Sequence, residues 1–167
     1  MNVQPDLFRI RHARHGDAAL ILGFIRELAE YEKLAHEVVA TDKDIETNLF
    51  GAQPRAECII AEHAKQPVGF ALFFHNFSTF LGRPGLYLED LYVKPEFRGK
   101  GFGRRMLAWL ARFAVQHDCG RFEWAVLDWN APAIRFYESL GAKIIDEWKI
   151  NRVTGDALSK LAAEASD

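Results

Sequence analysis

The segment that most constrains the fold is an apolar strand that leads through a glycine-rich turn directly into an amphipathic helix. The strand is predicted over Leu86–Val93, and Lys94-Pro95 ends it. The turn Arg98-Gly-Lys-Gly-Phe-Gly103 follows, and the helix after it carries apolar residues at helical spacing, namely Met106, Leu107, Leu110, Phe113 and Ala114. Strand, turn and helix in direct succession are typical of proteins that combine a sheet with covering helices.

The rest of the chain continues this mixture of strands and helices. Before the glycine-rich turn we expect a strand over Leu7–Ala13, a helix from Asp17 to about Tyr31 or Glu32, a short helix from the capping box Thr41–Asp44 to Gly51, an antiparallel hairpin of Ala56–Glu62 and Val68–Phe77, and a loop over Gly82–Gly85. After it we expect a strand over Arg121–Leu127, a helix from Asn130 to Gly141, one or two strands within Ala142–Val153 and a last helix over Asp156–Ala165. This order predicts one α/β (α+β) domain over residues 1–167, without repeats or linkers.

The charge balance bears on the possible partners. The chain has 167 residues with 21 Lys+Arg and 23 Asp+Glu, a net charge of −2, which argues against broad binding to nucleic acid. The two cysteines, Cys58 and Cys119, lie far apart and are expected to be free thiols. No segment approaches the ~20 apolar residues that cross a bilayer, and the six histidines show no metal-ligand spacing. We therefore expect a cytoplasmic protein without a metal, a nucleic-acid partner or a membrane anchor.

The glycine-rich turn has the features of a phosphate-binding site. Its three glycines let a ligand approach the backbone, and the first N–H groups of the following helix have no intrahelical partners. Basic side chains add positive charge at Arg98, Lys100, Arg104 and Arg105. The spacing fits neither a P-loop nor a Rossmann fingerprint, because both place glycines where this chain has other residues. What remains is the pattern Arg98-x-x-Gly101-x-Gly103.

This pattern, followed by Asn130…Phe136-Tyr137…Gly141-Ala142, resembles the GNAT superfamily of acyl-CoA-dependent N-acetyltransferases over nearly the whole chain. Three further segments, Glu27–Glu32, Leu86–Val93 and Trp129-Asn130, look like the spermidine/spermine (diamine) and thialysine N-acetyltransferase subgroup. The resemblance implies a central mixed, twisted sheet flanked by helices. It also implies that acetyl-CoA lies where the fourth and fifth strands diverge, and that the protein is a homodimer.

The resemblance also suggests roles for individual residues. A free alkylamine has a pKa near ~10 and must lose a proton before it attacks a thioester. Glu89 is expected to bind the amine and to act as general base, directly or through water, while strand alternation places Asp90 on the opposite face. Tyr137 matches the general acid that protonates the coenzyme A thiolate, and Tyr31 and Glu32 would line the amine pocket. The cofactor-binding residues are expected to be Leu91, Tyr92, Val93, Arg98, Gly99, Lys100, Gly101, Phe102, Gly103, Arg104, Asn130 and Ala133, with a backbone N–H within Leu91–Val93 stabilising the oxyanion.

The sequence thus predicts transfer of the acetyl group of acetyl-CoA to a small primary amine, either a di- or polyamine or a thialysine-like amino acid. Two alternatives stay open: acetylation of an antibiotic or of a protein amino group, and a non-catalytic acyl-CoA sensor. A sensor would keep Arg98–Gly103 but lose Glu89 or Tyr137, and both are present. The roles of Asp146 and Glu147 are also left open.

Overall fold

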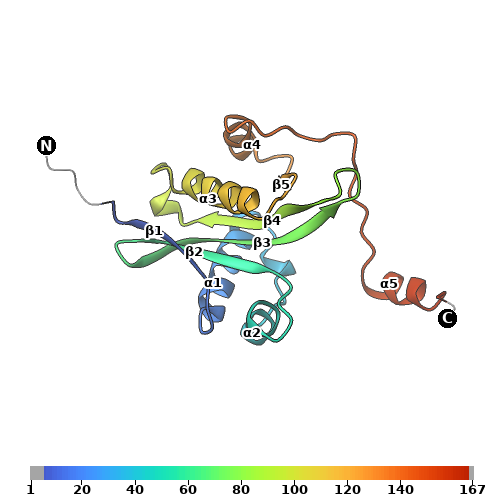
Figure 1. Ribbon diagram of the computed structural model, residues 1–167. Helices are drawn as coiled ribbons and strands as arrows, with labels where there is room; N and C mark the ends of the chain where they lie inside the picture. Colours follow the sequence, from blue (N-terminus) through green and yellow to red (C-terminus); the bar gives the residue numbers. More distant parts are fainter. Residues whose placement is uncertain (1–5, 166–167) are drawn as a thin grey trace, which may run out of the picture. The chain divides into compact units, whose positions relative to one another are not determined.

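The fold is that of a computed structural model, which describes residues 6–165. Its centre is a five-stranded sheet in the order β1-β2-β3-β4-β5 (Figure 1). The strands are β1 (Phe8–His12), β2 (Glu57–His63), β3 (Gln66–Ser78), β4 (Arg83–Val93) and β5 (Phe122–Trp124). The first four pair antiparallel and β5 pairs parallel to β4, so the expected mixed sheet is confirmed.

Helices cover both faces of this sheet. On one face lie α1 (Ala18–Tyr31) and α2 (Asp42–Phe50), and on the other lies α3 (Phe102–Gln116), which connects β4 to β5 (Figure 1). Two single 3-10 turns, η1 (Ala35–Glu37) and η2 (Pro95–Phe97), join these elements. The capping box is confirmed, because the Thr41 hydroxyl accepts from the Asp44 N–H while the Asp44 carboxylate accepts from the Thr41 N–H.

Aromatic packing on both faces fixes the central strands. On the α1 face the rings of Phe24 and Phe70 stack at 5.6 Å, within a cluster that includes Tyr92 of β4. On the α3 face Phe73 meets the edge of Phe113 at 5.2 Å. Each such buried side chain contributes on the order of 2 kcal/mol, so β3 is held against both helical layers through Phe70 and Phe73.

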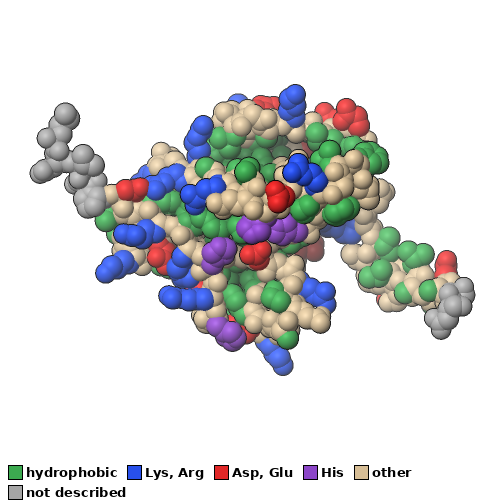
Figure 2. Space-filling view, viewed as in Figure 1, with side chains coloured by type: hydrophobic (Ala, Val, Ile, Leu, Met, Phe, Trp, Pro, Cys, Tyr) green, Lys and Arg blue, Asp and Glu red, His purple; other side chains and the backbone are tan. Residues whose placement is uncertain are grey.

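Histidine side chains gather near the middle of the face that Figure 2 shows. His117 follows the end of α3, and His75 belongs to β3. The His117 ring stacks on Phe113 at 3.9 Å, and His75 lies 5.9 Å from His117. The Nδ1 atom of His117 is 2.8 Å from the Phe113 carbonyl oxygen, so one ring nitrogen forms a hydrogen bond with the end of the helix. These rings thus form part of the aromatic layer. Cys58 and Cys119 are free thiols, as predicted.

The chain divides into two compact units, one ending at Ala125 and one beginning at Val126. The second contains α4 (Ala131–Glu138) and α5 (Gly155–Ala162). The Asn130 side chain caps α4 by accepting from the Ala133 N–H at 3.4 Å, and Gly141 has the left-handed φ of +91° expected after a helix. A single domain over residues 1–167 stays a prediction.

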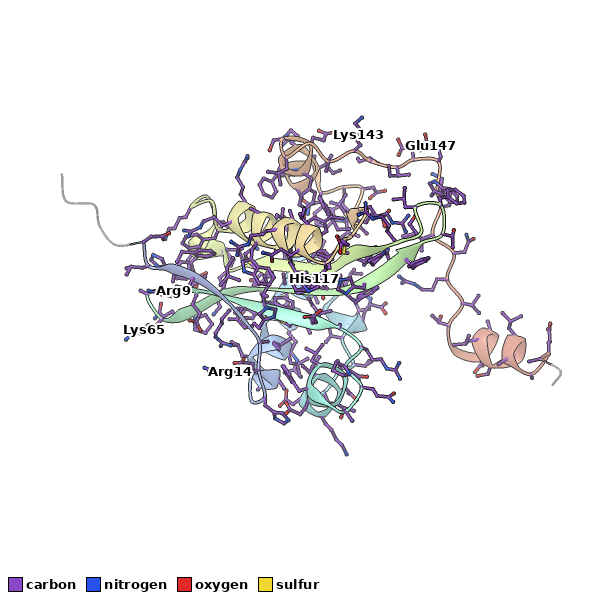
Figure 3. All side chains as sticks on the ribbon, in the orientation of Figure 1. Arg9, Arg14, Lys65, His117, Lys143 and Glu147 are labelled. Carbon is purple, nitrogen blue, oxygen red and sulfur yellow. The ribbon has the colours of Figure 1, made fainter. Side chains whose placement is uncertain are left out.

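The prediction of one or two strands within Ala142–Val153 is wrong, because this whole segment is described and contains no strand. Lys143 and Glu147 lie along its extended course (Figure 3). Trp148 and Ile150 are 75% and 78% exposed, so the apolar alternation is present but has no partner strand in this unit. The roles of Asp146 and Glu147 stay open.

Two strand boundaries also differ from expectation. Strand β4 begins at Arg83, since Ser78 and Phe77 pair with Arg83 and Pro84, and most of the expected loop over Gly82–Gly85 therefore belongs to the sheet. Strand β5 keeps only Phe122–Trp124 of the expected Arg121–Leu127. No helix within residues 6–165 is both long and apolar enough to cross a membrane.

Candidate functional site

The N-terminal end of α3 is left without a cap by its own chain. Gly101 precedes the helix with a left-handed φ of +77°, and no side chain within residues 6–165 is seen to cap its first turn. The Arg105 N–H bonds back to the Gly101 carbonyl at 3.1 Å, so the N–H groups before it point out of the helix end. With the helix dipole added, this end is suited to an anion.

The glycines keep this end open. A Cβ built at Gly99, Gly101 or Gly103 would meet no atom of the described part of the chain within 4 Å, so these residues leave space for a ligand beside the loop. Phe102 lies between them, but its ring stacks on Phe8 at 4.3 Å and is 7% exposed. Only the backbone of Phe102 can therefore contact a ligand.

Arg98 connects the turn to strand β4 and to helix α1. Its Nε donates to the Val93 carbonyl oxygen at 2.9 Å, and its guanidinium carbon lies 4.6 Å from the centre of the Tyr31 ring and 5.6 Å from that of Tyr92. The structure thus brings the predicted cofactor residue Arg98 next to the predicted substrate residue Tyr31. Arg105, in contrast, forms a bidentate ion pair with Asp6 at 3.0 and 2.6 Å, which directs its charge away from the turn.

Strand β4 separates from β5 just before this turn. Their pairing runs from Leu86–Phe122 to Leu88–Trp124, whereas β4 itself continues to Val93. Beyond Leu88, no strand of the described residues pairs with this edge of β4. Its free main-chain groups are available to a ligand, and they include the predicted Leu91–Val93. The Tyr92 side chain is buried among the core aromatics, so this residue too can offer only its backbone.

A bulge interrupts β4 at the same place. Leu72 pairs with Asp90 and Phe73 pairs with Leu88, which leaves Glu89 as the extra residue. The next pair is Phe74–Tyr87, and Phe74 and Leu72 share one face of β3, so Tyr87 and Asp90 also share a face although they are three residues apart. The simple alternation that placed Asp90 opposite Glu89 does not apply across the bulge.

Three carboxylates meet on the α1 side of this bulge. Burial, followed by the charges of Glu89 and Glu32, raises the pKa of Asp90 to about 6. Burial also raises the pKa of Glu32, at the end of α1, whereas the Glu89 side chain is exposed. A group of acidic side chains of this kind is a candidate site for a cation. Asp90 was not among the site residues predicted from the sequence, where its only signal was a second acidic residue within an apolar strand.

Comparison with known proteins identifies the family. Residues 24–142 match the acetyltransferase (GNAT) family. The chain belongs to this family. Members transfer an acyl group from acyl-CoA to an amine, and the chain is thus an acyl-CoA-dependent N-acetyltransferase.

Relatives extend over nearly the full length of this GNAT protein. It is 40% identical to thialysine N-epsilon-acetyltransferase of Sus scrofa, over 93% of this chain and 97% of that one. It is 32% identical to L-ornithine N5-acetyltransferase of Arabidopsis thaliana, over 92% and 87%. Among solved structures, an integron cassette protein of V. cholerae matches with a TM-score of 0.79 and 28% identity, covering 93% of this chain and 98% of that one.

The GNAT co-substrate acetyl-CoA fits the turn described above. The uncapped α3 end and its open glycines suit a pyrophosphate, and Arg98, Lys100 and Arg104 supply cations there. The Lys100 Nζ lies 4.9 Å from the Phe97 ring centre. Bound there, acetyl-CoA would supply the thioester, and the protein would supply the charges and main-chain groups around it.

Tyr137, Asn130 and Ala133 of the GNAT pattern belong to the second unit. Tyr137 is half-buried in α4, with its ring 5.5 Å from that of Phe136. Asn130 is 8% exposed and, together with Ala133, forms the α4 cap, so the expected capping role of Asn130 is confirmed. Contacts of these three residues with acetyl-CoA stay predictions.

Proposed function

We propose that this GNAT enzyme acetylates a primary amine of a small molecule, either a di- or polyamine or an amino acid that resembles thialysine. The observation that carries the proposal is the group of carboxylates around Asp90, which lies where β4 separates from β5. Three residues further along β4, the Val93 carbonyl accepts a hydrogen bond from Arg98. A cationic acceptor and an anionic co-substrate thus have neighbouring sites along one strand. The names of the relatives, which act on thialysine and L-ornithine, support a small amine.

Deprotonation of the acceptor is the first task of the site. The ammonium is attracted by Glu32, Glu89 and Asp90. Tyr31 lines the amine pocket together with Glu32. Glu89 binds the amine and removes its proton, directly or through water, and Asp90, whose pKa is raised by burial and by the Glu89 charge, acts with it. The raised pKa of Asp90 makes its carboxylate a stronger base than that of an ordinary aspartate.

Acyl transfer then proceeds through a tetrahedral intermediate. The amine nitrogen attacks the thioester carbon, and a backbone N–H within Leu91–Val93 stabilises the oxyanion. Collapse breaks the carbon–sulfur bond, and Tyr137 donates a proton to the departing thiolate, whose thiol has a pKa of about 8.5. The products are the N-acetylated amine and coenzyme A.

Binding of the co-substrate uses the turn, the free edge of β4 and the start of α4. Asn130 contacts the pantetheine arm in addition to capping its helix. The proposed cofactor-binding residues are Leu91, Tyr92, Val93, Arg98, Gly99, Lys100, Gly101, Phe102, Gly103, Arg104, Asn130 and Ala133.

A screen of acceptors tests the proposed function. Release of coenzyme A thiol is measured with acetyl-CoA and diamines, polyamines, thialysine, ornithine, aminoglycosides and peptides. We expect turnover with the small amines, and its loss in the Glu89→Gln/Asp90→Asn double variant, while calorimetry shows unchanged acetyl-CoA binding. Turnover only with aminoglycosides or peptides would contradict the substrate class. Binding of acetyl-CoA without turnover of any amine would indicate a sensor.

We also propose that the enzyme is a cytoplasmic homodimer that binds neither nucleic acid nor membranes. The two free thiols are compatible with a reducing compartment, and the nearly balanced charge disfavours polyanionic partners. The dimer is supported by the resemblance to the diamine and thialysine subgroup. Light scattering of the purified protein should give about twice the 19.0 kDa chain mass; a single-chain mass at micromolar concentration would contradict it.

A further inference from the structure

An ion pair on β5 has no role in the acetyl transfer proposed above. Arg121 immediately precedes β5 and its Nε lies 2.9 Å from the Glu123 Oε2 atom. The Asn76 side-chain amide donates to the same Oε2 at 3.1 Å. Among the described residues, the other carboxylate oxygen of Glu123 and the two terminal nitrogens of Arg121 have no hydrogen-bond partner. Both side chains are partly open to solvent, with exposed fractions of 38% and 39%.

The neighbouring backbone leaves room for this pair. Gly85 lies beside it on β4, and a Cβ there would collide with the Asn76 Oδ1 atom and would lie 3.0 Å from Cγ and 3.3 Å from Nε of Arg121. The Leu86 N–H donates to the Arg121 carbonyl at 2.9 Å, which anchors the start of β5 against β4. The pair is therefore a positioned feature of the sheet face.

The pair lies on the same face of the sheet as the acceptor carboxylates. Glu123 pairs with Tyr87, and Tyr87 shares its face with Asp90, as shown above. Burial and then the charges of Glu89 and Glu123 raise the pKa of Tyr87, so the charges of both acidic groups act on this tyrosine. Carboxylates thus continue from Glu32 through Asp90 to Glu123, and a cation, Arg121, ends the series.

The spacing along this face matches a short bifunctional molecule. From Tyr87, the partner of Glu123, to Asp90 is three residues including the bulge, or about 7–10 Å at ~3.3 Å per residue. The two nitrogens of an extended amino acid with a lysine-length side chain are about 7–8 Å apart, judged from standard bond lengths. The head of an α-amino acid carries one ammonium and one carboxylate. These two charges are complementary to the carboxylate of Glu123 and the guanidinium of Arg121.

We propose that Arg121 and Glu123 determine acceptor specificity by binding the head group of an ω-amino acid. The unused nitrogens of Arg121 take the α-carboxylate, the free oxygen of Glu123 takes the α-ammonium, and the ω-amine reaches Glu89 and Asp90. A diamine offers no carboxylate and brings a second ammonium toward Arg121, so it binds less well. This inference rests on the proposed acetyl transfer to a small amine and selects one of its two substrate classes.

A cycle of substrates and variants tests the inference. For the wild type, kcat/KM is measured with thialysine, its methyl ester and the diamine that lacks its carboxyl group, and with lysine, ornithine and their diamines. We expect the amino acids to exceed the esters and diamines by at least tenfold. In Arg121→Gln this preference should disappear, and Arg121→Lys should restore part of it. Arg9→Gln, which removes a cation on β1 at the far edge of the sheet (Figure 3), should leave it unchanged.

Each outcome decides the inference. Equal or better turnover of esters and diamines by the wild type overturns it, and this arm needs no folded variant. An unchanged preference in Arg121→Gln, with acetyl-CoA binding intact, also overturns it. Failure of the wild type with every amine would refute the proposed function instead, whereas turnover of diamines alone would refute only the role of Arg121 and Glu123.

Discussion

Replacing Asp90 by asparagine should make the protein more stable and less active at neutral pH. Burial, Glu89 and Glu32 raise the pKa of Asp90 to about 6, from 3.8 for an unperturbed aspartate. At pH 7.5 the folded protein therefore holds a carboxylate in a place that disfavours its charge. The difference between the two pKa values corresponds to ~3 kcal/mol of lost folding stability.

The sign of the pH dependence follows from proton binding. Between pH 3.8 and about 6 the folded state holds the Asp90 proton and the unfolded state does not, so stability falls as pH rises through this window. The loss is complete above pH ~7 and amounts to only ~0.5 kcal/mol at pH 4. Asparagine has a similar shape and no charge, so Asp90→Asn should recover the ~3 kcal/mol at pH 7.5 and little of it at pH 4.

Urea unfolding of the wild type and Asp90→Asn at pH 7.5 and pH 4 measures this difference. Asp128→Asn, at an exposed aspartate, is the matched control and should change stability at neither pH. In the same preparations kcat/KM for the best amine should fall by about 10²-fold, the usual contribution of a general base. A variant that is no more stable than wild type at pH 7.5, or equally stabilised at both pH values, would refute the electrostatic account of this site.

Three further substitutions separate the other roles. Gly103→Ala should stabilise α3 by ~0.5 kcal/mol and weaken acetyl-CoA binding in calorimetry. The control Gly23→Ala, in α1 and also with open space at its Cβ, should stabilise its helix without changing the Kd of acetyl-CoA. Equal Kd values for the two variants would place the cofactor elsewhere. Arg98→Leu removes the bond to the Val93 carbonyl and should raise the Kd of acetyl-CoA about tenfold or more, and an unchanged Kd would argue against its role. Tyr137→Phe should lower kcat by about 10²-fold with unaltered acetyl-CoA Kd, and unchanged turnover across pH would exclude it as general acid.

Local signals explain what the sequence could predict. The capping box at Thr41, the helix cap at Asn130 and the glycine turn before α3 each depend on neighbours within four residues, and all three are confirmed. The hairpin of β2 and β3 is set by its own short turn. Such features depend on residues close together in the sequence and not on contacts between distant segments.

Contacts between distant segments explain what it missed. The bulge at Glu89 exists only in the pairing of β3 with β4, and it alone brings Asp90 to the face of Tyr87. The position of Arg121 depends on the parallel register of β5, which is fixed across the whole length of α3. Apolar alternation after Ala142 predicted strands, but alternation cannot supply the neighbour that a strand needs.

Strand β4 would allow a chain of net charge −2 to bind both of the proposed substrates, an anion and a cation. Its side chains at Leu88 and Tyr92 are buried on opposite faces, which holds the stretch between them rigidly. Within this stretch lies Asp90, which we propose faces the acceptor. Just beyond it the Val93 carbonyl accepts from Arg98, and the chain enters the turn proposed to bind the phosphates of acetyl-CoA. Because one packed strand sets both positions, charge changes at either end should alter the affinity for one substrate only. Core changes that shift β4, such as truncation of Phe73, should impair both together.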